Sequence, residues 1–247
     1  MNLSEINIRE KDFHNKLQSQ KRGRFENIFY KALYNISEDF FDYLKNNANN
    51  AEILDYGCGV GSFVEEVAKF GPKKIVGIDI SEVSINKAVE RTKELKTDVN
   101  FIVDNCEKTK FANNSFDIVY GSGILHHLQI NKCLDEIHRV LKSNGSLVFI
   151  EPLGTNPIIN FYRKLTPKSR SDDEHPFNFR DIKLIKKIFG DVEVDYYGFL
   201  TLVFFPFYKN PKNSKFFKFI SFLDKLFLKI KFFNFLAWSI LIKAKKI

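Results

Sequence analysis

A glycine-rich segment places the strongest constraint on how this chain folds. It reads Leu54-Asp55-Tyr56-Gly57-Cys58-Gly59-Val60-Gly61 and joins a short apolar run to an amphipathic stretch. Glycines at such a junction let the backbone turn sharply and let a ligand approach the main chain. That ligand would meet the free N–H groups at the start of the next helix. The spacing is G-x-G-x-G, whereas the dinucleotide fingerprint is G-x-G-x-x-G. The segment therefore predicts a strand, a ligand-binding turn and a helix.

Short apolar runs and amphipathic stretches alternate along the rest of the chain. The runs predict strands over 51–55, 74–78, 99–103, 116–120, 146–150, 192–197 and 238–243. The amphipathic stretches predict helices over 24–46, 61–70, 82–95, 130–141, 156–165 and 178–189. Residues 1–23 are polar and are expected to be irregular or partly helical. Strands that alternate with helices indicate a parallel sheet with helices on both faces.

Composition excludes several classes of protein. A chain of 247 residues with 44% hydrophobic residues fits one large domain, or one domain with an appendage. The chain has three cysteines, Cys58, Cys106 and Cys133, with no paired spacing. Such a set argues for a reducing compartment and against a cysteine-based metal site. We therefore expect no metal. The polar N-terminus is no secretory signal, and no apolar run reaches the roughly 18 residues of a spanning helix. A cytoplasmic location follows as the expectation.

The basic charge of the chain is concentrated at one end. The formal net charge is +8, yet residues 201–247 contain ten lysines and one acid, Asp224. Residues 1–150 contain 20 basic and 21 acidic residues. A nucleic-acid-binding domain would carry its basic residues across one face of the fold, so we expect no nucleic-acid partner.

A second acid strengthens the ligand-binding interpretation of the glycine segment. Asp79 ends the predicted strand at 74–78 and is followed by Ile80 and Ser81. An acid at this point can accept hydrogen bonds from both hydroxyls of a ribose. The structural alternative is that Asp79 only supports the helix that Ser81 caps.

Four segments in this order, 54–63, 76–81, 101–120 and 134–152, resemble the class I S-adenosylmethionine-dependent methyltransferases of the small-molecule type 11 kind. The last segment reads Leu-Asp-Glu-Ile-His-Arg-Val-Leu-Lys-Ser-Asn-Gly-Ser-Leu-Val-Phe-Ile-Glu-Pro. The resemblance covers about residues 50–152. It implies a Rossmann-like, seven-stranded, mostly parallel sheet with helices on both faces. It also implies S-adenosylmethionine as cofactor and S-adenosylhomocysteine as product.

The resemblance further implies which residues bind the cofactor. They are Asp55, Gly57, Cys58, Gly59, Gly61, Asp79, Ile80, Asp104, Asn105, Cys106, Gly121 and Ser122. The glycine segment would surround the methionine part, Asp79 would bind the ribose, and Gly121 and Ser122 would line the sulfonium. Relatives carry Asp-Ala-Glu where this chain has Asn105-Cys106-Glu107. Either Asn105 or the preceding Asp104 would then face the adenine amine.

Three residues after the fourth and fifth predicted strands are candidates for chemistry. His126 and His127 follow the fourth strand, and a histidine can remove an acceptor proton near neutral pH. The alternative is a structural pair in which one histidine orients a loop. Glu151 ends the fifth strand, where active-site residues of open sheets gather. It could be a base, a substrate ligand or the partner of an arginine.

The segment 155–177 would pass over the acceptor pocket of this fold. Arg163, Arg170 and His175 could hold a phosphate, carboxylate or sugar. The alternative is a solvated polar loop.

An aromatic stretch follows, because residues 201–236 contain eleven of the 27 phenylalanines. A helix over 215–233 would place one set of apolar side chains on one face and four lysines on the opposite face. The apolar set is Phe219, Leu223, Leu226, Phe227, Ile230 and Phe233, and the lysines are Lys215, Lys218, Lys225 and Lys229. Three interpretations remain open: an interfacial membrane helix, a lid or dimer helix, and an aromatic wall for an apolar acceptor.

The sequence predicts one methyltransferase domain over 1–247. Residues 1–48 would form a helical cap, 49–200 and 237–247 the Rossmann-like core, and 201–236 an aromatic insertion between the last two strands. The expected function is methyl transfer to a small molecule, such as a lipid, a quinone-like compound or a lipid-linked sugar. A cofactor-binding regulatory or scaffold protein is the alternative. The glycine spacing opposes a nucleotide-dependent oxidoreductase, and Tyr120-Gly121-Ser122-Gly123 disfavours methylation of amide or base nitrogens.

Overall fold

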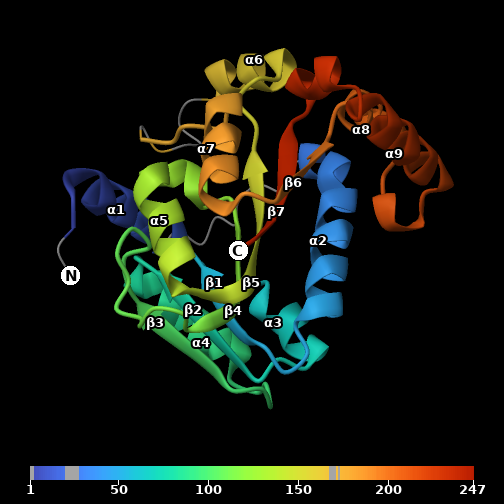
Figure 1. Ribbon diagram of the computed structural model, residues 1–247. Helices are drawn as coiled ribbons and strands as arrows, with labels where there is room; N and C mark the ends of the chain where they lie inside the picture. Colours follow the sequence, from blue (N-terminus) through green and yellow to red (C-terminus); the bar gives the residue numbers. More distant parts are fainter. Residues whose placement is uncertain (1–2, 20–27, 167–170, 172) are drawn as a thin grey trace.

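The computed structural model describes residues 3–19, 28–166, 171 and 173–247, and the structural statements below concern these residues. Seven strands form one sheet in the order β3-β2-β1-β4-β5-β7-β6 (Figure 1). The strands are β1 (Glu52–Tyr56), β2 (Lys74–Asp79), β3 (Val99–Val103), β4 (Phe116–Ser122), β5 (Leu141–Pro152), β6 (Val192–Tyr197) and β7 (Ser239–Lys245). Only β7 runs antiparallel to its neighbours, β5 and β6. The predicted fold class is confirmed.

The helices cover both faces of this sheet (Figure 1). In chain order the helices are α1 (Glu5–Ser19), α2 (Tyr34–Asn47), α3 (Val64–Val67), α4 (Glu82–Thr92), α5 (Ile130–Val140), α6 (Pro157–Leu165), α7 (Phe179–Phe189), α8 (Leu200–Val203) and α9 (Lys215–Leu228). Alternate strand residues serve opposite faces. Leu54 and Val119 pack in a core with α5 and α7, whereas Ile53 and Tyr120 pack in a second core with α2.

The central strands are nearly continuous apolar runs because both of their faces are buried. Four of the five residues of β1 are buried, and β1 pairs in parallel with both β2 and β4. The carboxyl ends of these three strands therefore meet at one edge of the sheet. This edge is where the loops that carry the predicted site residues come together.

Two predicted helices and the N-terminal segment differ from the structure. Residues 61–70 form only the short α3 and a 3-10 turn at Ala68–Phe70, because Gly57, Gly59 and Gly61 hold the preceding chain in left-handed conformations. The predicted helix 24–46 is a 3-10 turn at Ile28–Leu33 followed by α2, with 24–27 outside the described residues. Residues 1–23, for which partial helix was expected, contain the regular helix α1.

The helix predicted over 215–233 also ends early. α9 stops at Leu228, because Ile230 is extended (φ −78°, ψ 108°) and starts a 3-10 turn at Lys231–Leu236. This break brings the Phe233 ring against Phe227, with 4.0 Å between the ring centroids. The prediction of an apolar face opposite a lysine face was wrong. Phe217, Ile220, Asp224 and Leu228 are buried, so they take the face opposite the predicted apolar set, and the lysines lie along the flank between the two.

The segment between β6 and β7 is fixed to the domain by buried polar contacts. The carboxylate of Asp224 accepts hydrogen bonds from the backbone N–H groups of Gly198, Phe199 and Leu200 at 2.8–3.2 Å. These are the free N–H groups at the start of α8, where a negative charge is favourable. Ser221 accepts a hydrogen bond from Asn35 of α2 at 2.7 Å. None of the helices in the described ranges has the length and apolar character needed to cross a membrane.

Candidate functional site

The glycine turn after β1 has an open side. Gly57, Gly59 and Gly61 all have positive φ angles. A Cβ atom added to Gly59 would meet nothing within 4 Å. The Gly59 N–H donates to the Asp79 carboxylate at 3.0 Å, so the turn is tied to the end of β2. The backbone of this turn is therefore rigid, and a ligand can approach it closely.

Asp79, the predicted ribose ligand, ends β2, and two backbone N–H groups hold its carboxylate. One carboxylate oxygen accepts from Gly59 and the other accepts from the Ser81 N–H at 2.8 Å. Burial raises the pKa of Asp79, and its backbone hydrogen bonds oppose that rise. Ser81 caps α4 by accepting from the Ser84 N–H at 3.0 Å. Each Asp79 oxygen has a second lone pair. Asp79 can therefore support the start of α4 and still accept hydrogen bonds from a ligand.

Asp55 lies under the glycine turn at the end of β1. Its carboxylate accepts a hydrogen bond from the Tyr120 hydroxyl at 3.0 Å. Burial raises the pKa of Asp55 to about 7, the Tyr120 hydrogen bond lowers it, and the charge of Asp79 adds to the rise. Gly121 and Ser122 end the adjacent strand β4, with Gly121 buried and Ser122 exposed. A positively charged ligand at this edge would favour the ionised form of Asp55.

The sequence left open whether Asp104 or Asn105 faces the adenine. Both Asp104 oxygens accept backbone hydrogen bonds, from Asn105 at 3.0 Å and from Lys110 at 3.1 Å, so this carboxylate shapes the turn after β3. The Asn105 side-chain oxygen accepts from the Glu107 N–H at 2.9 Å. Its amide nitrogen donates to Asn7 of α1 at 3.3 Å.

The other predicted cofactor residues lie beside the turn. Cys58 donates its N–H to the Ile78 carbonyl at 2.8 Å, and Ile80 is half-buried one residue beyond Asp79. Cys106 is buried, and its carbonyl oxygen accepts from the Tyr56 hydroxyl. Burial raises the pKa of both thiols, so they stay protonated and supply shape, not reactivity.

Helix α1 crosses the carboxyl ends of β2 and β3. Asn15 accepts a hydrogen bond from the Ser81 hydroxyl at 2.6 Å. Lys11 pairs with Glu82 at 2.7 Å, and Asn7 contacts Asn105. This helix therefore covers the region where the sequence places the adenosine part of a cofactor.

His126 and Glu151 form a buried pair at the ends of β4 and β5. His126 Nδ1 lies 2.7 Å from one Glu151 oxygen. The other oxygen accepts from the N–H groups of Ile124 at 3.0 Å and Leu125 at 2.8 Å. A carboxylate only accepts hydrogen bonds, so Nδ1 donates to Glu151, and in the neutral form of the ring Nε2 keeps its lone pair. Glu174 Oε1 lies 4.0 Å from that Nε2 atom.

His127 points to a different group of side chains. Its Nδ1 atom lies 3.2 Å from Glu10 Oε2, and His14 Nε2 lies 3.6 Å from the same oxygen. Burial lowers the pKa of His127. Burial acts to raise the pKa of Glu10, but its polar contacts with His127, His14 and Ser171 hold that pKa well below its usual range. His127 thus ties α1 to the sheet edge.

Two groups in the described residues have ligand atoms within 4.8 Å of one another, Glu10–His14–His127 and His126–His127–Glu174. The expectation of no metal therefore remains a prediction.

The predicted substrate residues are dispersed. Arg163 of α6 donates to Asn160 of the same helix at 3.2 Å. Arg170 lies outside the described residues. His175 has an exposed side chain, and its N–H donates to the His126 carbonyl at 2.9 Å. Asp173 in the same loop accepts two hydrogen bonds from Arg9 of α1, at 2.8 and 2.7 Å.

Sequence reasoning missed three residues of this region with titratable side chains, Glu10, His14 and Glu174. Glu10 and His14 are four residues apart, which places both on one face of a helix. That spacing could have identified a polar face on α1. No sequence signal shows that the face meets His127.

The sequence matches known proteins over its central part. Residues 54–149 match the family described as methyltransferase domain. A demethylmenaquinone methyltransferase from Bacteroides fragilis is 35% identical over 104 residues, 40% of this chain and 42% of that protein. A sterol 24-C-methyltransferase from Aspergillus fumigatus is 30% identical over 135 residues, 53% of this chain and 36% of that protein. The chain therefore spans less than half the length of these curated relatives.

Solved structures match over a larger part of the chain. A geranyl diphosphate C-methyltransferase from Streptomyces coelicolor, in complex with Mg²⁺, geranyl diphosphate and S-adenosylhomocysteine, has a TM-score of 0.66 at 16% identity and covers 100% of both chains. A phosphoethanolamine N-methyltransferase from Haemonchus contortus has a TM-score of 0.64 at 20% identity, covering 99% of this chain and 61% of that one. These likenesses show the fold. Together with the family match over residues 54–149, they make the chain similar to S-adenosylmethionine-dependent methyltransferases in its central sequence and in its fold.

Proposed function

We propose that this protein transfers a methyl group from S-adenosylmethionine to a small apolar acceptor, such as a lipid, a quinone-like compound or a lipid-linked sugar. One observation carries the proposal. The carboxyl edge of the sheet brings the open glycine turn and Asp79 to the same side as His126, whose Nδ1 atom is held by Glu151. This shared edge supports placing the methyl donor and a proton acceptor on the same side of the sheet.

The residues of the turn fit the cofactor. The open space at Gly59 admits a ligand against the backbone, and Asp79 has lone pairs available for ribose hydroxyls. Asp55, whose pKa is raised by burial, gains from a cationic ligand nearby. When bound, the cofactor supplies a methyl group already activated by its positive sulfur. The protein then has to orient the acceptor and exclude water.

His126 is the proposed general base. With Nδ1–H donated to Glu151, its Nε2 lone pair can accept the proton that leaves the acceptor atom. Glu151 is fully buried, so it is a positioning residue that fixes the ring and its tautomer. His127 faces Glu10 of α1 and is assigned a structural role in holding that helix over the cofactor.

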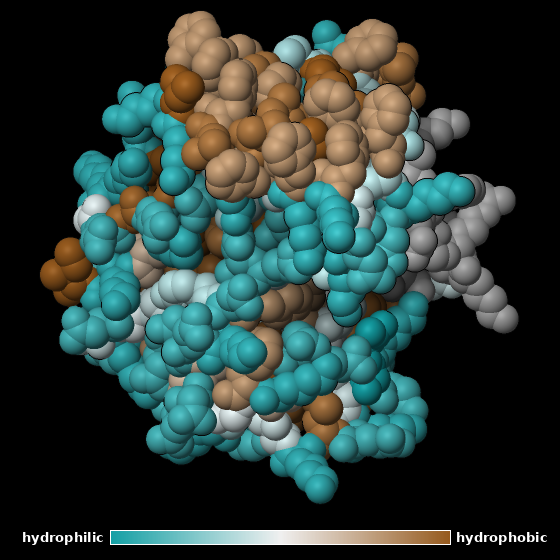
Figure 2. All heavy atoms as spheres, turned by 90° about the vertical axis from the view of Figure 1, so that its right-hand side faces the viewer, coloured by the Kyte–Doolittle hydropathy of each residue, from teal (hydrophilic) through white to brown (hydrophobic). Residues whose placement is uncertain are grey.

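The apolar surface supports an apolar acceptor met at a membrane. Large hydrophobic side chains of α6 and of residues 201–236 are exposed together (Figure 2). Because Asp224 and Ser221 fix α9 to the domain, we assign this segment to membrane docking and not to a moving lid. The proposal includes a cytoplasmic location at a membrane surface.

It also includes a single methyltransferase domain. In this domain α1 forms the cap over the cofactor site, whereas α2 packs in the hydrophobic core.

The test uses methyl-labelled S-adenosylmethionine, purified protein and an extract of the source cells, separated into organic and aqueous phases. Label in the organic phase, lost with His126→Gln, supports the proposal. Label only in the aqueous phase would contradict the apolar acceptor. Cofactor binding without label in either phase would instead favour the regulatory alternative, and Asp79→Ala should abolish that binding. A titration with nicotinamide dinucleotides tests the oxidoreductase alternative.

A further inference from the structure

The surface at one end of the molecule is unusually apolar and is called here the aromatic face. It is formed by Phe161 and Leu165 of α6 and by Phe207, Phe219, Phe222 and Phe232 of the segment before β7. Phe161, Phe207 and Phe232 are 66%, 73% and 75% exposed. In Figure 2 hydrophobic side chains cover the top of the molecule, with hydrophilic side chains below them. Exposed apolar patches of this kind mark interaction sites.

The aromatic face is continuous across elements that are far apart in the sequence. The Thr155 hydroxyl, at the start of α6, donates to the Phe235 carbonyl at 2.9 Å. The Phe29 ring packs edge-on against both Tyr162 of α6 and Phe205. These contacts join α6 to the segment 201–236, so the face is one continuous surface.

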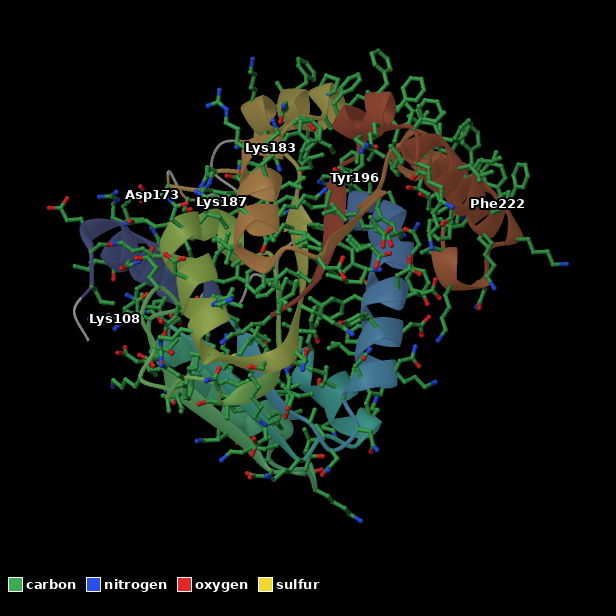
Figure 3. All side chains as sticks on the ribbon, viewed as in Figure 1. Lys108, Asp173, Lys183, Lys187, Tyr196 and Phe222 are labelled. Atoms are coloured by element: carbon green, nitrogen blue, oxygen red, sulfur yellow. The ribbon has the colours of Figure 1, made fainter. Side chains whose placement is uncertain are left out.

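A groove lined by lysines opens beside this face, between α7, β6 and α9. Its volume is about 740 Å³. Its basic side chains are Lys183 and Lys186 of α7, Lys225 and Lys229 of α9, and Lys231. Figure 3 shows Lys183 on α7 and Tyr196 on β6, two of the elements that line the groove.

Most of this positive charge is not neutralised by the protein. The two carboxylates of the groove are already paired, Asp39 with Lys225 at 2.6 Å and Asp195 with Lys243 at 2.9 Å. Among the described residues, no carboxylate lies within ion-pair distance of the other four lysines of the groove. A site with this excess of ammonium groups binds anions.

We propose that this groove binds the anionic headgroup of a membrane lipid while the aromatic face enters the bilayer. The position of α9 favours a lipid over a soluble anion. On this helix Phe219 and Phe222 are exposed on the aromatic face, and Lys225 and Lys229 of the neighbouring turns line the groove. A phosphate held by the lysines would therefore leave its acyl chains beside the phenylalanines. Basic residues flanking an apolar face are the pattern of interfacial membrane binding.

The inference deepens the proposed function and is tested without a methyl acceptor. Flotation measures binding of the full chain to phosphatidylcholine vesicles with and without phosphatidylglycerol. The double variant Lys183→Gln/Lys229→Gln should bind the anionic vesicles about tenfold to thirtyfold more weakly, since each lysine near the surface contributes about threefold to fivefold. The matched control Lys108→Gln/Lys187→Gln removes the same charge outside the groove, and both control positions are labelled in Figure 3.

Three results would overturn the inference. The first is an equal loss in the groove variant and the matched control, which would show general electrostatic attraction. The variant Phe219→Ser/Phe222→Ser should bind both kinds of vesicle more weakly than the wild type. Unchanged vesicle binding by this variant is the second result. The third is release of the protein from vesicles by millimolar inorganic phosphate, which would identify a soluble anion as the ligand. Thermal unfolding confirms that each variant is folded.

The failure of the proposed function would look different from the failure of this inference. If the protein binds anionic vesicles but no methyl label enters the organic phase of the extract, the proposed apolar acceptor is contradicted and the headgroup site is not.

Discussion

Replacing Gly59 by alanine should weaken cofactor binding while leaving most of the stability intact. Gly59 has a φ of +52°, and an added Cβ meets nothing within 4 Å. The only cost to folding is the left-handed conformation, about 1–2 kcal/mol for a residue with a Cβ. The new methyl group would stand in the space where a ligand approaches the turn. We expect affinity for S-adenosylhomocysteine to fall by at least a factor of about 10, or about 1.4 kcal/mol.

Two other glycines provide matched comparisons. At Gly57, with φ +75°, an added Cβ would lie 2.4 Å from Ile124 Cγ1 and 2.6 Å from its Cδ1. Overpacking of about 1–3 kcal/mol adds to the conformational cost, so Gly57→Ala should lose about 2–5 kcal/mol of unfolding free energy. Gly71 has the same φ of +75° but lies outside the proposed site, at the end of the 3-10 turn after α3. Gly71→Ala should lose stability without losing cofactor affinity.

Urea unfolding gives the stability of each variant, and calorimetric titration gives its affinity for S-adenosylhomocysteine. The reasoning is refuted if Gly59→Ala binds the product as tightly as the wild type. It is also refuted if Gly59→Ala and Gly71→Ala lose equal affinity, because the effect would then come from backbone strain alone.

Three further predictions concern titration, catalysis and anchoring. Since the pKa of Asp55 is about 7 in the free protein and a cationic cofactor favours its ionised form, affinity for S-adenosylmethionine should rise with pH up to about 7 and then level off. Calorimetry on Asp55→Asn should show no such rise. Glu151→Gln should lower kcat by about 10²-fold or more through loss of the fixed His126 tautomer, with product affinity unchanged; equal kcat would contradict this. Asp224→Ala should lower the free energy of unfolding, measured with urea, by about 2–3 kcal/mol, because it leaves buried N–H groups unpaired. Cofactor affinity should not change; a loss of affinity would show that Asp224 does more than hold α9 against α8.

The strands and the cofactor turn were predictable because their signals are local. The central strands are nearly continuous apolar runs, and six of the seven strands were placed within two residues of their observed starts and ends. The exception is β5, which begins at Leu141 where 146–150 was expected. The positive φ angles of Gly57 and Gly59 follow from residue type. In contrast, α1 is fixed by long-range polar contacts, such as Arg9–Asp173 and Glu10–His127. Nothing in the polar sequence of residues 1–23 indicates these partners.

The faces of α9 show why periodicity alone could not decide the role of the tail. The helix has apolar side chains on two opposite sides, Phe217 and Leu228 on one and Phe219 and Leu226 on the other. A helical wheel does not say which side the domain covers. The deciding residue is Asp224, the one acid of the tail, which pulls its own side of the helix onto the start of α8. Burial raises the pKa of Asp224, and the hydrogen bonds from the N–H groups near the start of α8 oppose that rise. Turning the helix over would break these hydrogen bonds and the one from Asn35 to Ser221, so long-range polar contacts that a helical wheel does not show fix which side of α9 is buried.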